Sequence, residues 1–198
     1  MERDTAFDDT QYYRGAGIHL IYEPAFGSVE GLKDGILLEV GFDVVAPNQP
    51  LDIASWAYDL AAPLVDIVDN RARQVACYHP GYTLVEKLQA ISTKFRQQQV
   101  TGDLPANFMR HYYDVFRLLQ QPMVQALIGT DAYLEQKAKR FRTADDMDLT
   151  RNPAFVLAEP AVREKLASAY AASEALYYRG QPPFEEIIDS IQGWASKL

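Results

Sequence analysis

Residues 83–119 read TLVEKLQAISTKFRQQQVTGDLPANFMRHYYDVFRLL, and this stretch decides the fold. Apolar residues recur in each half of it at the spacing of one helix face. They are Leu84, Leu88, Ile91 and Phe95 in the first half and Phe108, Tyr112, Val115, Phe116 and Leu119 in the second. Residues 101–103, Thr-Gly-Asp, break the pattern, and Pro122 ends it. The stretch therefore predicts two antiparallel helices joined by a short turn, an αα-hairpin.

The start of each helix is predicted from its first residues. Thr83 and Glu86 have the spacing of a capping box, in which the threonine oxygen accepts from the glutamate N–H while the carboxylate reaches back. Pro105 suits an early position in the second helix, because proline is well tolerated in a first helical turn. We expect the two helices to begin close to these residues.

Charged residues lie along the margins of both apolar stripes. At ~100° per residue, Lys87 lies ~80° from the centre of its stripe, and His111 has a similar marginal position on the second helix. Folding the chain back near Thr101 brings Lys87 level with Asp114. Two interpretations stay open. One is a surface salt bridge beside an Arg110–Asp114 pair, each worth a few tenths of a kcal/mol, and the other is a cation and a carboxylate that share a site.

The segments TLVEKLQA and RHYYDVFRLL, at residues 83–90 and 110–119, resemble the paired C-terminal motifs of the AbiEii/AbiGii nucleotidyltransferase toxins. That family belongs to the DNA polymerase β-like superfamily. The resemblance covers roughly residues 12–194 and implies that Lys87 contacts a triphosphate or takes part in catalysis. It also implies that Arg110 and Asp114 are the matching pair of the last motif, where they orient Lys87 or the substrate. His111 stands where many members have an acid.

The function implied by this resemblance is that of a toxin of a toxin–antitoxin or phage-defence system. Such an enzyme transfers nucleotides from an NTP, with Mg²⁺ as cofactor and tRNA as one possible acceptor. A cognate antitoxin and a separately encoded N-terminal half are the other partners that the resemblance suggests.

The strand expected at residues 36–45, ILLEVGFDVV, carries the candidate metal ligand. Glu39 lies on a strand where the family typically has an acidic residue, and carboxylates are ligands that Mg²⁺ prefers. Asp43 falls on the same face of the strand. Four strand residues span ~13 Å, so Glu39 and Asp43 cannot together bind one ion directly.

The first motif of the superfamily, Gly-Ser followed by Asp-x-Asp on a strand, is missing. Gly27-Ser28 leads into Glu39 instead, and Asp146-Met147-Asp148 falls among predicted helices, where a loop or helix-capping role is expected. The chain therefore resembles the second half of the family. We expect an impaired or incomplete nucleotidyltransferase; the alternative is a non-catalytic binding or assembly module that retains this half.

A basic cluster follows the second predicted helix, and Phe141 interleaves with it: Lys137, Lys139, Arg140 and Arg142. One interpretation is that Lys137 and Arg140 bind a triphosphate or the 3′ end of an RNA acceptor. The other is a solvated helix C-terminus, where cations complement the helix dipole.

The rest of the chain predicts a small sheet region followed by helices. Strands are expected at 12–22, 36–45 and 73–78, a loop at 24–35, a short helical pattern at 51–64, and helices at 131–141, 160–178 and 183–194. The near-continuous apolar run at 36–45 favours a central strand. The expected architecture is α+β. A small mixed sheet in residues 1–81, which the resemblance identifies as part of a nucleotidyltransferase palm, precedes a helical bundle in residues 82–198.

Composition narrows the class of protein. The 198 residues are 48% hydrophobic, which is enough for a substantial core, and 19 basic against 27 acidic residues give a net charge of −8. That balance argues against a general nucleic-acid coat protein but allows a local basic groove. Cys77 is the single cysteine, so no internal disulfide can form and a reducing cytoplasm is expected. No apolar run approaches the ~18 residues of a membrane span.

Overall fold

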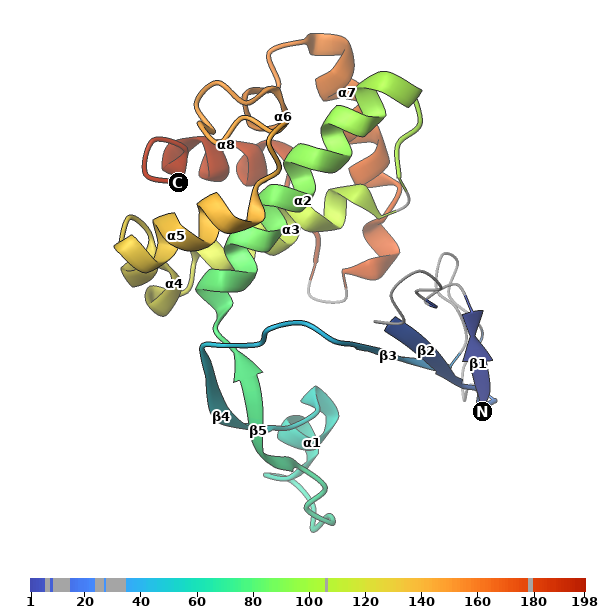
Figure 1. The fold of residues 1–198 in the computed structure, drawn as a ribbon. Helices are drawn as coiled ribbons and strands as arrows, with labels where there is room; N and C mark the ends of the chain where they lie inside the picture. Colours follow the sequence, from blue (N-terminus) through green and yellow to red (C-terminus); the bar gives the residue numbers. More distant parts are fainter. Residues whose placement is uncertain (6–7, 9–14, 24–26, 28–34, 106, 178–179) are drawn as a thin grey trace.

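The computed structural model describes residues 1–5, 8, 15–23, 27, 35–105, 107–177 and 180–198. Figure 1 shows small sheets built from the N-terminal part of the chain and a bundle of helices built from the remainder. The expected α+β architecture is thus confirmed. Residues 12–14 of the first expected strand, most of the expected loop at 24–35, Ser28 and position 178 lie outside the described residues.

The described strands form two antiparallel sheets, where one mixed sheet was expected. β1 (Glu2–Asp4), β2 (Gly15–Leu20) and β3 (Ile36–Gly41) pair in that order, and β4 (Asn48–Ile53) pairs with β5 (Ala72–Tyr78). The strand predicted at residues 73–78 is therefore confirmed as β5.

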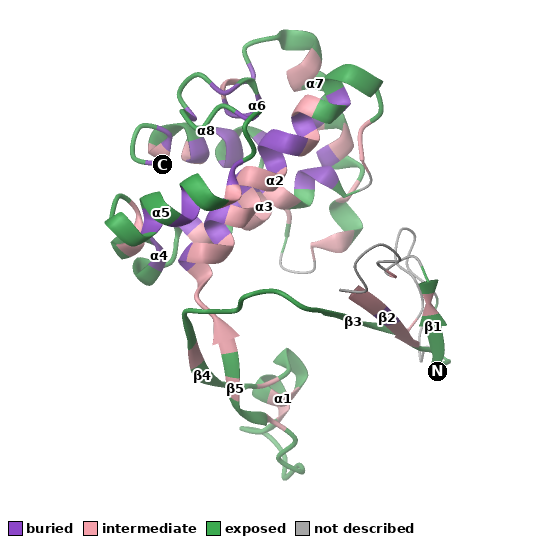
Figure 2. Cartoon of the chain, viewed as in Figure 1, coloured by how far each residue is buried: buried purple, intermediate pink, exposed green. Residues whose placement is uncertain are grey.

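The prediction that residues 36–45 form a central strand is wrong. β3 ends at Gly41, lies at the edge of its sheet, and pairs with β2 alone among the described strands. All six of its residues are exposed, as Figure 2 shows in green. An apolar run indicates that a strand favours burial on both faces, but it does not say which segment covers it. Here the chain continues from β3 as an extended segment toward β4 and leaves both faces open.

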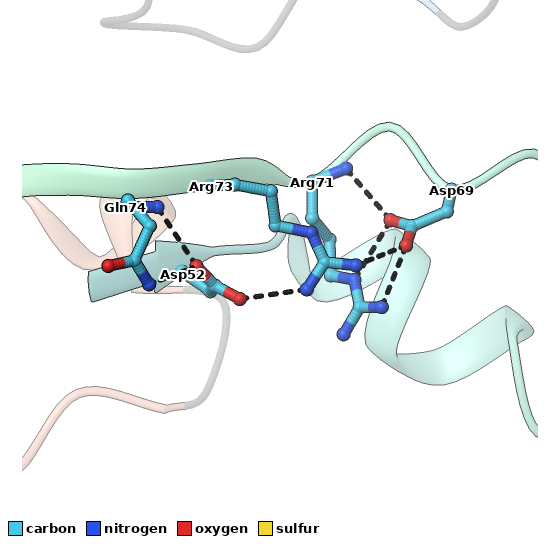
Figure 3. Close-up of polar contacts among 5 residues, drawn as sticks. All are labelled: Asp52, Asp69, Arg71, Arg73 and Gln74. Atoms are coloured by element: carbon cyan, nitrogen blue, oxygen red, sulfur yellow. Dashed lines mark hydrogen bonds and ion pairs between the residues drawn. The ribbon is translucent and has the colours of Figure 1, made fainter. Parts of the chain in front are cut away.

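The helical pattern expected at 51–64 is correct only in its middle part, since residues up to Ile53 belong to β4 and residues 62–64 form a turn. α1 (Trp56–Ala61) is a short helix whose N-cap is Ser55, and the Ser55 hydroxyl oxygen accepts from the Tyr58 N–H. Pairing with β5 explains the difference, because Asp52 binds both the Arg73 guanidinium, at 2.7 Å, and the Gln74 N–H, at 2.9 Å (Figure 3).

A second carboxylate stabilises the turn before β5. Asp69 binds the Arg71 guanidinium at 2.8 Å and also contacts Arg73, so that two arginines and two aspartates form one exposed network (Figure 3). Hydrogen bonds from Arg71 hold the pKa of the Asp69 carboxyl well below its usual range. Periodicity in the sequence carries no information on such contacts, so it does not show where β4 ends and α1 begins.

The predicted αα-hairpin is confirmed by α2 (Pro80–Thr101) and α3 (Phe108–Leu119), which run antiparallel at the centre of the bundle (Figure 1). Every residue of both predicted apolar stripes is buried. Gly102 closes α2 at a φ of 79°, a left-handed conformation that glycine adopts without steric cost.

Both helix starts differ from the expected ones. α2 begins at Pro80 and is capped by His79, whose Nδ1 accepts from the Gly81 N–H, so Thr83 is already inside the helix and the predicted capping box is wrong. The Glu86 carboxylate instead accepts from the Tyr78 hydroxyl at 3.0 Å. α3 begins at Phe108 rather than near Pro105, because Asn107 adopts a left-handed φ of 58° just before it.

Further helices complete the bundle around this hairpin: α4 (Pro122–Leu127), α5 (Asp131–Arg140), α6 (Pro153–Val156), α7 (Pro160–Ala171), the 3₁₀ turn η2 (Glu174–Leu176) and α8 (Phe184–Trp194). The helices predicted at 131–141 and 183–194 are confirmed, and the one predicted at 160–178 ends at Ala171 and is followed by η2. None of the helices in the described part of the chain is long and apolar enough to cross a membrane.

The hydrophobic core lies in the helical bundle. In the described chain, all of its buried hydrophobic residues lie from Leu84 onward. Two buried tyrosines satisfy their hydroxyls inside it: Tyr112 donates to the Ala154 carbonyl at 2.7 Å and Tyr133 to the Leu198 main-chain oxygen at 2.8 Å. The bundle thus contains the packing that positions any site on α2 and α3.

We predict that Leu88→Ala destabilises the protein by ~2–5 kcal/mol, because Leu88 is fully buried on α2 and its removal leaves a cavity. Val100→Ala on the same helix is the matched control, since Val100 is 84% exposed, and we expect a change of no more than about 0.5 kcal/mol. Urea unfolding followed by circular dichroism measures both. Equal losses in the two variants would contradict the assignment of the core.

Candidate functional site

Lys87 of α2 and Asp114 of α3 form an ion pair across the hairpin. The Lys87 Nζ lies 2.7 Å from the Asp114 Oδ2, and the two side chains are 30% and 25% exposed. Lys87 directly precedes the buried Leu88 of α2, and Asp114 directly precedes the buried Val115 of α3. The predicted register, which brought these two residues level, is therefore confirmed as a direct contact.

A second contact joins the same two helices two turns farther along α2. The Lys94 Nζ lies 2.8 Å from the His111 Nε2. Because a lysine ammonium can only donate, Nε2 accepts and the ring proton lies on Nδ1. This Nδ1 is buried and has no hydrogen-bond partner in the described structure. Lys87, Lys94, His111 and Asp114 together line one edge of the hairpin, and we call them the rim cluster.

The rim cluster carries an excess of positive charge. Burial, together with the charges of Lys94 and Lys87, lowers the pKa of His111 to about 4, so the imidazole is neutral at pH 7. Burial and the nearby Lys87 also lower the pKa of Lys94. Two lysines therefore face a single carboxylate, and an anion placed here would relieve their mutual repulsion.

Sequence reasoning missed Lys94. A usable signal was present, because Lys87 and Lys94 are seven residues apart, which is two helical turns, and so lie on one face of α2. The same antiparallel register that brings Lys87 opposite Asp114 also brings His111 opposite Lys94.

Arg110 lies one turn before Asp114 and is exposed. The expected Arg110–Asp114 ion pair is not formed between these two described residues, and the Asp114 carboxylate pairs with Lys87. The positive charge of Arg110 nevertheless reaches the cluster, since it contributes to the low pKa of His111. Its guanidinium makes no ion pair with any described carboxylate and is available to an anionic ligand.

Lys137 and Arg140 of α5 are engaged elsewhere. The buried Lys137 Nζ donates to the Leu198 main-chain oxygen, and burial lowers the pKa of this lysine. Arg140 pairs with Glu86 at 2.6 Å and with Asp43 at 3.0 Å. No contact in the described structure joins either residue to the rim cluster, and both instead hold α5 to its neighbours.

Glu39 is exposed on β3 opposite Gly17. The described residues contain no group of three or more histidine, cysteine, aspartate or glutamate side chains that could hold a metal ion. Asp146 and Asp148 belong to a loop, as predicted; Asp146 accepts from the Asp148 N–H, and Asp148 pairs with Arg151 at 2.8 Å. Glu39 is thus not part of a group of three such ligands in the described part of the chain.

Comparison with known proteins gives one match. A family model described as "Nucleotidyl transferase AbiEii toxin, Type IV TA system" matches residues 2–190, which is nearly the whole chain. No curated protein matches, and no solved structure matches.

We predict that the Lys87–Asp114 pair contributes little to stability. A double-mutant cycle with Lys87→Met and Asp114→Asn, read out by urea unfolding, should give a coupling below ~1 kcal/mol because both groups are partly solvated. The exposed Arg163–Glu185 pair on α7 and α8 provides the reference cycle. A coupling of several kcal/mol at Lys87–Asp114 alone would indicate a mainly structural pair.

His111 should make the protein less stable in acid. Its pKa is about 4 in the folded chain and near the ordinary value of 6.5 when unfolded, so the unfolded state binds more protons between these values. Stability should fall as the pH drops from ~6.5 to ~4, and His111 should cause no further loss below that pH. In His111→Gln, urea unfolding at a series of pH values should show a shallower decline. An unchanged slope would contradict the buried neutral imidazole.

Proposed function

The chain belongs to the AbiEii nucleotidyl transferase toxins of type IV toxin–antitoxin systems, and from this we propose that it binds the triphosphate of an NTP at the rim cluster. The observation that carries the proposal is the Lys87–Asp114 contact at 2.7 Å between the two motif helices. Both residues belong to the two segments whose resemblance to the family motifs is most specific. Their convergence supports a shared site for the two motifs on this hairpin.

The charges of the rim cluster suit a polyphosphate. Lys87 contacts the phosphates. The Asp114 carboxylate orients the Lys87 ammonium and keeps it directed toward the ligand. Lys94 adds a second positive charge beside neutral His111, and Arg110 presents a free guanidinium one turn away. A guanidinium suits phosphate oxygens because it donates two parallel hydrogen bonds. An overall charge of −8 does not oppose this, because the excess of cations is local.

The reaction that fits this arrangement is nucleotidyl transfer. A hydroxyl oxygen of the acceptor, for which we propose the 3′ end of a tRNA, bonds to the α-phosphorus while the bond to pyrophosphate breaks. The hydroxyl proton passes to water. Lys87 stabilises the negative charge that develops on the leaving pyrophosphate.

Such chemistry uses Mg²⁺ held by carboxylates and by the phosphates of the substrate. Mg²⁺, when bound, neutralises triphosphate charge and aligns the reacting groups. Glu39 stays a candidate ligand for it, and we assign no step to the ion on this chain. A segment that carries the Asp-x-Asp carboxylates, such as a separately encoded half, would have to complete the site beside Glu39.

A non-catalytic nucleotide-binding or assembly module is the second candidate. The observation that favours it is the lack of a metal-ligand cluster among the described residues. In that case the rim cluster binds a nucleotide without turning it over. In both cases a cognate antitoxin is the expected genetic partner, since the family belongs to a toxin–antitoxin system.

We predict that Lys87→Ala weakens the binding of Mg²⁺-ATP at least tenfold in isothermal titration calorimetry, which corresponds to ~1.4 kcal/mol. Lys139→Ala on α5 is the control, because it removes the same charge from an exposed position outside the cluster. A parallel assay follows labelled NTP incorporation into bulk tRNA. Transfer that is lost in Lys87→Ala supports the enzyme, and binding without transfer supports the module. If the wild-type protein fails in both assays, the proposal is wrong.

A further inference from the structure

A cavity lies next to the rim cluster, between the N-terminal end of α3 and the segment formed by α7 and η2. Its volume is about 340 Å³, near the lower end of the ~300–1,000 Å³ typical of small-molecule sites. α3 and α7 pack against each other in this part of the bundle (Figure 1). The cavity is therefore built between two packed elements and has the size of a small ligand rather than of a polymer.

The lining of this cavity is apolar with one aromatic wall. Phe108 and Met109, which are almost completely buried, and Leu176 line its apolar part. Tyr177 contributes an aromatic ring, which is fixed by an edge-to-face contact with Tyr113 at a centroid distance of 4.7 Å. A rigid aromatic side chain in an apolar recess is the arrangement on which nucleobases stack.

Polar groups are few and lie where a base edge or a phosphate could reach them. Arg110 lines the cavity and has no carboxylate partner in the described chain. Asn107 also lines it, and the amide of this residue makes no hydrogen bond to the described residues and no capping bond to α3. An amide that can both donate and accept is suited to reading the edge of a base. Ser173 adds a hydroxyl, which donates to the Tyr170 carbonyl at 2.6 Å.

The cavity and the rim cluster are adjacent along α3. Arg110, which lines the cavity, precedes Asp114 by four residues, a rise of ~6 Å along one face of the helix. The charges of Asp114 and Arg110 both reach the Tyr177 hydroxyl, on whose pKa they act in opposite directions, with burial as the main cause of its increase. The aromatic wall of the cavity therefore lies within the electrostatic range of both residues.

From this adjacency we propose that the cavity holds the base and ribose of the nucleotide whose triphosphate lies on the rim cluster. The base stacks on Tyr177 and its edge meets Asn107, while the phosphates pass Arg110 and end at Lys87 and Lys94. This inference rests on the proposed function, since it assigns the remaining part of the same ligand. In this arrangement the residues of α3, α7 and η2 that line the cavity determine which nucleotide base is bound.

The test fills the cavity without touching the rim cluster. Ala172 lines the cavity and is exposed at the end of α7, so Ala172→Trp places an indole in the recess without disturbing the core. Ala171→Trp makes the same substitution at the neighbouring exposed residue, which does not line the cavity, and is the matched control. Circular dichroism and urea unfolding verify that both variants fold like the wild type.

Calorimetry with ATP and with inorganic tripolyphosphate separates the base from the phosphates. We expect the wild-type protein and Ala171→Trp to bind ATP at least tenfold more tightly than tripolyphosphate. In Ala172→Trp this preference should disappear while the affinity for tripolyphosphate is unchanged. Titrations with GTP, CTP and UTP then show which base the cavity prefers. A preference for ATP over tripolyphosphate that survives in Ala172→Trp, or that is missing in the wild type, overturns the inference.

The two proposals fail in different ways. If Lys87→Ala leaves ATP binding intact while Ala172→Trp abolishes it, the rim cluster is not the phosphate site and the base cavity stands. If Lys87→Ala weakens both ligands and Ala172→Trp weakens neither, the phosphate site stands and the base cavity is rejected. Saturation-transfer NMR with adenosine alone gives a third reading, because a signal that Ala172→Trp removes supports the cavity even when no nucleotide transfer is observed.

Discussion

The apolar seam between α2 and α3 fixes the position of every polar group discussed above. Leu84, Leu88 and Ile91 on one helix and Tyr112 and Val115 on the other are fully buried. Each such side chain stabilises the folded state by ~1.5–3 kcal/mol, whereas a partly exposed ion pair contributes less than ~1 kcal/mol. Packing therefore sets the register of the two helices, and the register in turn brings the charged margins together. The rim cluster is a consequence of the seam and not its cause.

The local charge at the rim cluster differs in sign from the net charge of the whole chain. The protein is acidic overall, yet Lys87 and Lys94 share one edge with a single carboxylate, and burial keeps His111 neutral. A neutral imidazole cannot repel the two ammonium groups, and its Nε2 satisfies Lys94. The rim cluster thus retains a net attraction for an anion.

The sequence predicts the helical half of the fold well because periodicity and register are local properties. Both stripes of the hairpin, the level of Lys87 with Asp114 and the stripe of α8 follow from spacing alone. Contacts between distant segments could not be predicted in this way. The Arg140 pairs, the Lys137 contact and the open edge of β3 depend on which segments meet after folding, and periodicity says only that a face favours burial. The early start of α2 was missed because His79 and Pro80 form a stronger start signal than Thr83.

The segment after β3 is joined to the helices by the ion pair between Asp43 and Arg140, whose side chains are 59% and 27% exposed. Attraction between solvated charges weakens as dissolved ions accumulate, with a screening distance of ~10 Å at 0.1 M salt. Apolar packing, in contrast, is hardly affected at that concentration. The contact between the segment after β3 and α5 should therefore loosen as the electrolyte content of the solution rises, while the packing of the helices stays unchanged.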